Sequence, residues 1–154
     1  MKSAYFRVVD LFERIPLDLI TFLARICVGT LFFWSGLLKV KGWTAGTTLA
    51  LFETEYPLPV IPPEIAAYIA TAAELSLPIL LFAGFLTRFA ALGLLIMTLV
   101  IQIFVYPNAF DTHGTWALAV LLLMKCGAGR LSLDYLLFGD RSAIGSRKQQ
   151  ILAV

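Results

Sequence analysis

Charged residues are scarce in this sequence of 154 residues: they make up 14%, while hydrophobic residues make up 60%. Soluble domains usually carry about 25% charged and about 45–50% apolar residues. The mean hydropathy of +0.87 departs in the same direction. A soluble enzyme is excluded, because a domain of this size cannot hide so much apolar surface from water. Disorder is excluded too, since it requires a polar, highly charged composition.

Residues that bind cofactors are also few. The chain has one histidine and two cysteines, Cys27 and Cys126, which stand far apart in apolar stretches. More histidines or cysteines would be needed for haem ligation by two histidines, for an iron–sulfur cluster or for thiol–disulfide exchange. There is no GxGxxG, phosphate loop, nucleophile–base set or metal-ligand spacing. We therefore expect no haem, metal or nucleotide, and the net charge of +2 does not indicate nucleic acid.

The sequence is instead rich in long apolar runs, and a membrane span needs about 20 residues. Because lipid cannot pair with backbone groups, each run is expected to form a helix. No strand alternation or repeat competes with this interpretation. The prediction is an all-α membrane protein: a four-transmembrane-helix bundle forming a single integral domain over residues 1–154. The predicted spans cover about 19–38, 65–85, 89–106 and 115–126, and the ends of the last stay open.

The segments around these runs have patterns of their own. Residues 1–18 combine apolar and charged positions at helical spacing, which predicts an N-terminal amphipathic helix on the membrane surface. Charges persist to Asp18, unlike in a secretory signal. The loop 44–63 should contain a short helix at about 48–55, followed by a proline-stiffened stretch. The polar tail, 141–154, is expected to be loose.

Two glycines, Gly127 and Gly129, follow the last apolar run, and they can end a helix and turn the chain. Ser132 is then expected to cap a short C-terminal interfacial helix. Arg130 and Asp134, four residues apart, are candidates to pair on that surface.

Lysine and arginine are unevenly distributed between the two sides of the membrane that the predicted spans define. Nine lie on the side of the two termini, and two, Lys39 and Lys41, lie on the other. This bias predicts that both termini are cytoplasmic. Lys39, Lys41, Arg88 and Lys125 lie at predicted span ends, where snorkelling and orientation explain them.

Two charges lie inside predicted spans, where each is costly. Arg25 and Glu74 should lie at similar depth on antiparallel helices, so we expect a buried ion pair. Pro78 frees the carbonyl of Glu74, and Ser76 adds a hydroxyl, which makes a small polar pocket. Trp34 is a nearby aromatic candidate. Three roles for these polar residues remain open: a structural contact between helices, a ligand or quinone pocket, and a proton path.

His113 is expected to be an exposed loop residue near the interface. The alternative is a proton donor beside a lipid head group or quinone.

Three stretches together resemble the DoxX family of small bacterial membrane proteins, over about residues 20–137. They read ARICVGTLFFWSGLLKVKGW (24–43), ELSLPILLFAGFLTRFAAL (74–92) and GAGRLSLD (127–134). One position departs: the family often has proline where this chain has Ala128. The polar residues that match the family are Arg25, Lys39, Glu74, Arg88, Arg130 and Asp134.

The resemblance implies a four-helix, multi-pass protein of the bacterial inner membrane. Some relatives are small subunits of quinone reductases or quinol oxidases, others belong to redox or thiol-stress complexes, and animal relatives look like chaperones or cargo receptors. We expect a membrane subunit of a quinone-linked oxidoreductase that acts with a protein partner or a second copy. A quinone is the candidate ligand. The alternatives are a non-enzymatic chaperone or assembly scaffold, and a small-solute transporter. Pocket candidates are Arg25, Glu74, Ser76, Lys39 and Trp34.

Overall fold

The computed structural model describes residues 2–139; residue 1 and residues 140–154, which include the predicted loose tail, lie outside the described part. Within that part the chain is helical and contains no strand. The helices are α1 (Lys2–Glu13), α2 (Leu17–Ala45), α3 (Thr47–Glu55), α4 (Pro63–Ala83), α5 (Thr87–Val100), the π-helical turn η1 (Ile101–Val105), α6 (Phe110–Cys126) and α7 (Leu133–Phe138).

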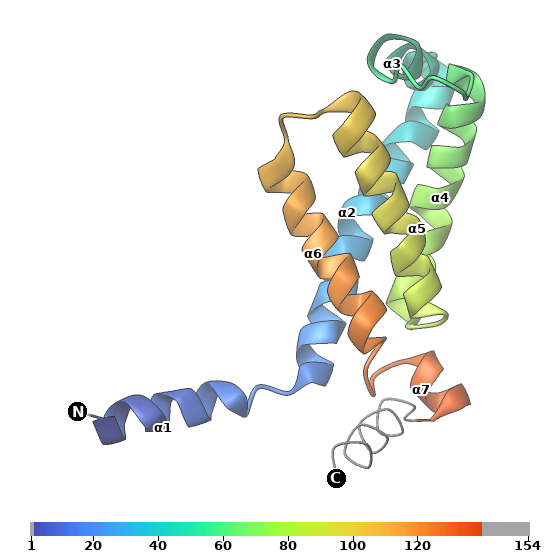
Figure 1. The fold of residues 1–154 in the computed structure, drawn as a ribbon. Helices are drawn as coiled ribbons and strands as arrows, with labels where there is room; N and C mark the ends of the chain where they lie inside the picture. Colours follow the sequence, from blue (N-terminus) through green and yellow to red (C-terminus); the bar gives the residue numbers. More distant parts are fainter. Residues whose placement is uncertain (1, 140–154) are drawn as a thin grey trace.

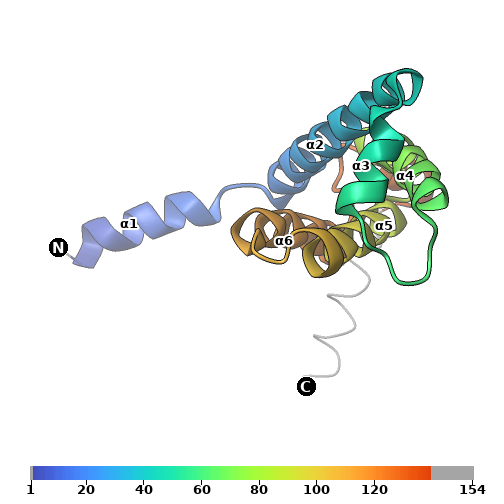
Figure 2. The same ribbon diagram turned by 90° about the horizontal axis from the view of Figure 1, so that it is seen from above.

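Four helices, α2, α4, α5 and α6, lie side by side and form the body of the molecule (Figure 1). Each packs against two of the others: α2 against α4 and α6, and α5 against α4 and α6. Seen along their axes, the four form a closed ring (Figure 2). Helix α3 covers one end of this bundle, here called the α3 end, and α7 lies at the opposite α7 end (Figure 1).

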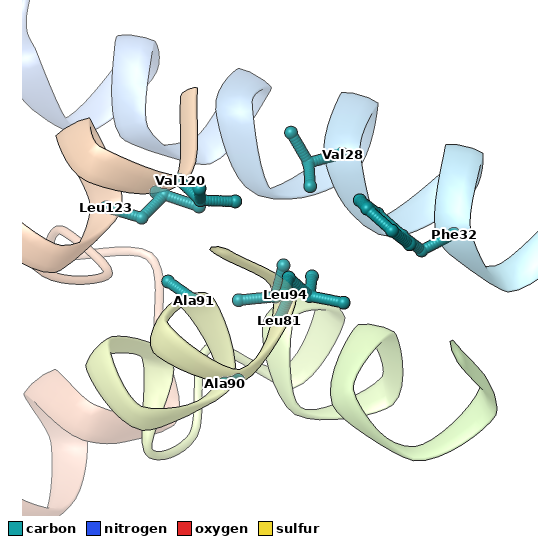
Figure 3. Packing of buried hydrophobic residues seen from close by; sticks show 8 residues of the cluster. All are labelled: Val28, Phe32, Leu81, Ala90, Ala91, Leu94, Val120 and Leu123. Carbon is teal, nitrogen blue, oxygen red and sulfur yellow. The ribbon is translucent and has the colours of Figure 1, made fainter. Parts of the chain in front are cut away.

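The centre of the bundle is a small apolar core to which all four helices contribute (Figure 3). Two alanines of α5 allow close approach, while larger side chains fill the remaining space. Large apolar side chains also lie exposed on the outside of the bundle, as expected of a surface that faces lipid. The core residues are Val28, Phe32, Leu81, Ala90, Ala91, Leu94, Val120 and Leu123.

Among residues 2–139, three helical segments are long and apolar enough to cross a membrane: Leu17–Ala45, Pro63–Ala83 and Thr87–Val105. Helix α6 has 17 residues, which is at the lower limit for a span. The all-α membrane architecture is confirmed, but the count of four transmembrane helices is not. Helix α6 begins at Phe110, so its extra length comes from the start of the predicted span.

Two helix ends differ from the prediction. Helix α2 runs to Ala45, past the predicted end at residue 38, and ends at Gly46, whose φ is +73°. The third span ends in the π-helical turn η1, which the apolar pattern does not indicate. The short helix α3 is confirmed, and the proline-rich connection after it is not helical but bends at residues 59–61 rather than running extended throughout.

Helix α1 projects away from the bundle in both views (Figures 1 and 2). The amphipathic helix predicted at the N-terminus is therefore present, and its apolar side chains, such as Phe6, Leu11 and Phe12, are exposed. Its position on a membrane surface stays a prediction.

Candidate functional site

A buried ion pair between α2 and α4 is the clearest polar feature inside the bundle. The Nζ atom of Lys39 lies 2.7 Å and 2.9 Å from the two carboxylate oxygens of Glu74, and 3.0 Å from the Oγ atom of Ser35. Lys39 is 8% exposed and Glu74 is 3% exposed. All three ammonium hydrogens therefore have acceptors, and the charges offset each other away from water.

The predicted ion pair between Arg25 and Glu74 is wrong. The partner of Glu74 is Lys39, which the sequence assigns to a span end because the first apolar run stops just before it. In the structure α2 continues to Ala45, about two turns past the predicted end, so Lys39 lies within the helix. Gly36 lies against Glu74 and so fixes the register of the two helices. Arg25 is eleven residues from Gly36 along α2, or about 16 Å.

Hydroxyl and aromatic groups surround the pair toward the α3 end. Thr48 donates from Oγ1 to the carbonyl of Lys39 at 2.7 Å, which ties α3 to α2. The indole of Trp43 donates to Thr71 on α4 at 3.3 Å. Gly42 has no side chain where a Cβ would overlap the hydroxyl of Thr48. These contacts hold α3 over the end of α2.

An open hollow of about 350 Å³ lies beside the ion pair. It brings one charged group, three hydroxyls and two apolar side chains together on α2 and α3. Leu38, on its rim, is exposed on the outside of the bundle. The hollow is lined by Ser35, Leu38, Lys39, Thr47, Thr48 and Leu51.

Two predicted pocket residues lie elsewhere. The side chain of Ser76 is exposed and donates to the carbonyl of Ala72, four residues earlier on α4. Trp34 is 59% exposed and points out of the bundle, whereas Phe32 fills the core. Both side chains face outward because of the helical period, which directs neighbouring positions of one turn to different sides of the helix.

Arg25 is fully buried near the α7 end, with 0% exposed. It donates to the carbonyl of Leu81 at 3.3 Å and to the carbonyl of Leu131 at 2.5 Å. Its Nε atom has no hydrogen-bond partner, and the guanidinium lies 5.4 Å from the ring centre of Phe22. Arg25 therefore joins α2, the end of α4 and the chain before α7 through backbone acceptors.

The GAGRLSLD stretch closes the α7 end of the bundle. The two carboxylate oxygens of Asp134 accept hydrogen bonds from the backbone N–H groups of Leu86 and Thr87, at 2.8 Å and 3.0 Å. Asp134 thereby caps the start of α5, where free N–H groups attract an anion. Its own backbone N–H donates to the carbonyl of Gly84 at 2.8 Å. Ser132 caps α7 by accepting from Tyr135, as predicted.

The predicted pairing of Arg130 with Asp134 is wrong. Arg130 lies 3.7 Å from Asp18 through its Nε atom, and its backbone N–H donates to the same carboxylate at 2.9 Å. The two motif charges thus bind different helices, α2 and α5. Arg88 donates to the carbonyl of Lys125 at 3.3 Å and so joins the start of α5 to α6.

Replacing Asp134 with alanine should lower the stability of the protein by about 1–2 kcal/mol, because two N–H groups at the start of α5 lose their acceptor. Asp111→Ala is the matched control, since Asp111 also lies in the first turn of a helix but is exposed. Thermal unfolding in detergent measures both. Equal losses in the two variants would show that the carboxylate acts only through the helix dipole.

His113 is not an exposed loop residue, contrary to the prediction. It lies in α6, is 5% exposed, and its Nδ1 atom is 2.7 Å from the Oε1 atom of Gln102. Its ring centre is 5.0 Å from that of Trp116. The described residues contain no group of three or more histidine, cysteine or carboxylate side chains that could hold a metal ion.

Two tyrosines near the α3 end have raised pKa values. Burial, together with nearby Glu74, Tyr106 and Glu55, raises the pKa of Tyr56 to about 12. Tyr106 donates from its hydroxyl to the Glu55 carboxylate, and this hydrogen bond, with burial and the Glu55 charge, raises the pKa of Tyr106. The contact joins the chain after η1 to α3.

A raised tyrosine pKa stabilises the folded protein while the phenol keeps its proton. An unfolded tyrosine has a pKa of about 10. The contribution of Tyr56 is therefore complete below about pH 10 and is lost as the pH rises toward 12. Glu55→Gln should move the ionisation of Tyr106 toward lower pH, whereas Glu53→Gln, on the same helix, should not. Phenolate absorbance measures both, and identical titration curves would contradict the contact.

The fold and this buried polar site define a small helical membrane protein. The model of the DoxX family matches residues 20–107, so the chain belongs to the DoxX family. An "uncharacterized protein" of Haemophilus influenzae is 34% identical over 116 residues, which are 69% of this chain and 75% of the relative. No solved structure matches the chain. The resemblance is confirmed, although its third stretch, 127–134, lies outside the matched residues.

Proposed function

We propose that this protein is a small membrane subunit of a quinone-linked oxidoreductase system and that its Lys39–Glu74 pair binds the quinone head group. The observation that carries the proposal is that Lys39, whose ammonium is buried against Glu74, also lines an open hollow. Small-molecule sites are mostly apolar hollows of about 300–1,000 Å³ with a few placed polar groups. The hollow beside Lys39 has this size and composition.

The residues in this wall suit a quinone. A quinone carbonyl only accepts hydrogen bonds, and Lys39 only donates them. Two of the ammonium hydrogens face the Glu74 carboxylate and one faces Ser35, so the head group would replace Ser35 as an acceptor. A bound quinone would supply the electron-accepting group, while Lys39 orients its carbonyl and the exposed Leu38 contacts its apolar part.

A partner protein completes the proposal. The described residues contain the polar pair but no group of side chains that could hold a metal ion, and in this proposal another subunit supplies the electrons. In this proposal α6 is the fourth span, both termini are cytoplasmic, and the membrane is the bacterial inner membrane. The lysine and arginine bias supports that orientation.

Purification in a mild detergent tests this function. We expect quinone to copurify with the protein, and quinol oxidation in membranes to fall when the protein is deleted. Absence of bound quinone, together with unchanged quinol oxidation, would exclude the proposal.

A non-enzymatic scaffold is the second candidate, and the α7 end favours it. There Arg25 and Asp134 bind backbone groups of three separate segments, so this end is closed by structural contacts. Affinity capture with mass spectrometry would identify the assembly. Turnover of a quinol by the isolated protein would exclude a purely structural role.

A further inference from the structure

The contacts of His113 determine which of its ring nitrogens carries the hydrogen. The Nε2 amide group of Gln102 donates to the carbonyl of Pro107 at 2.6 Å. A carbonyl only accepts, so this contact directs the amide oxygen of Gln102 toward His113. Nδ1 of His113 lies 2.7 Å from that oxygen. Nδ1 must therefore be the protonated nitrogen and donate to Gln102.

The second ring nitrogen is then an acceptor. In a neutral imidazole with hydrogen on Nδ1, the Nε2 atom carries a lone pair. Nε2 has no partner among residues 2–139, although the residue is 95% buried (5% exposed). Nε2 is not among the fully enclosed side-chain atoms without partners in that range, which are Arg25 Nε and Thr87 Oγ1. A buried side chain thus presents one free acceptor.

A backbone irregularity places Gln102. It lies in η1, where the N–H of Tyr106 bonds to the carbonyl of Ile101, five residues earlier, at 2.8 Å. Such π-helical turns are rare and frequently occur at functional sites. The same region faces the α3 end, since Tyr106 also binds Glu55 of α3. The turn thus carries Gln102, whose contact with Nδ1 leaves the lone pair on Nε2.

We propose that Nε2 of His113 binds the hydroxyl group of a hydroquinone and rejects the corresponding quinone. A lone pair accepts from a hydroxyl, whereas a quinone carbonyl has no hydrogen to donate. The ring of Trp116, 5.0 Å from the imidazole, supplies an aromatic surface beside the site. The choice of a hydroquinone as the hydroxyl donor rests on the proposed function, but the tautomer and the free lone pair do not. Lys39, a donor, can bind the oxygen of either form, so His113 is the residue that would distinguish them.

Nitrogen NMR of the full chain in phosphatidylcholine nanodiscs tests the proposal, because one histidine gives one imidazole signal set. We expect the Nδ1–H tautomer, a shift of the Nε2 signal with a short-chain hydroquinone, and no shift with the matched quinone. An Nε2–H tautomer, or equal responses to both ligands, would overturn it. A shift caused by phosphatidylglycerol, with none from hydroquinone, would assign the hydroxyl to lipid and also overturn it.

Variants separate this site from the one at Lys39. Gln102→Leu removes the acceptor of Nδ1 and should weaken hydroquinone binding about tenfold. Thr112→Val, at an exposed position next to His113, is the control and should bind normally. If Gln102→Leu does not fold, the tautomer and the ligand selectivity of the unaltered protein still test the proposal. Hydroquinone binding that is lost in Lys39→Met/Glu74→Leu but unchanged in Gln102→Leu would refute this inference and leave the proposed function standing.

Discussion

Glu74→Gln is expected to destabilise the protein by about 3–5 kcal/mol, because it leaves the ammonium of Lys39 buried without a carboxylate. The amide oxygen of glutamine can still accept hydrogen bonds, but the amide carries no charge. Lys39→Met should have a similar effect, since it leaves the carboxylate of Glu74 buried and unpaired. Both side chains are almost fully enclosed, so water solvates the unpaired charge poorly. Unfolding in mixed detergent micelles measures the loss.

The double variant Lys39→Met/Glu74→Leu should recover to within about 1 kcal/mol of the natural protein, because apolar residues of similar volume can replace a buried ion pair. Lys41→Met is the matched control: Lys41 is two residues further along α2 and exposed, so its loss should change little. Single losses below about 1 kcal/mol, or a double loss equal to the sum of the singles, would show that the pair is not formed.

Gly84→Ala is expected to give the second large loss, at the α7 end. The φ angle of Gly84 is +63°, a conformation that side chains rarely adopt. An added Cβ would also overlap the guanidinium of Arg25 and lie 2.5 Å from the Cβ of Ser132. Backbone strain and steric overlap therefore add at this position.

Gly46→Ala separates these two effects. Gly46 has a φ of +73°, but an added Cβ there would meet nothing within 4 Å. We expect a loss of about 1–2 kcal/mol at Gly46 from backbone strain alone. At Gly84 the overlap should add about 1–3 kcal/mol. Equal melting temperatures for the two variants would contradict the close packing of Arg25 against Gly84.

The fold class could be predicted because lipid restricts the chain so strongly. Long apolar runs can only be helices there, and the predicted segments agree with α2, α4, α5 and α6 to within several residues at most ends. The sequence places the end of α2 too early, because the charged residue Lys39 is typical of a membrane boundary. Lys39 stays inside the helix because Glu74 neutralises it, and that partner is 35 residues away in sequence.

Local contacts could be predicted better than distant ones. The cap that Ser132 provides to α7 depends on a residue three positions away, and it was predicted correctly. Asp134 binds the start of α5, 47 and 48 residues earlier, and no spacing rule indicates that contact. The apolar pattern does not indicate the burial of His113 or the π-helical turn that carries its partner Gln102. The parts of the site that the sequence does not predict therefore depend on contacts between residues far apart in sequence and on the π-helical turn.

The amount of quinone that copurifies with the double variant Lys39→Met/Glu74→Leu tests the central claim most directly. This variant should fold but lacks the polar pair beside the hollow. We predict that it copurifies with little quinone, while Lys41→Met retains the amount found with the natural protein. A stably folded double variant that keeps its full quinone content would contradict the assignment of the Lys39–Glu74 pair as the ligand site.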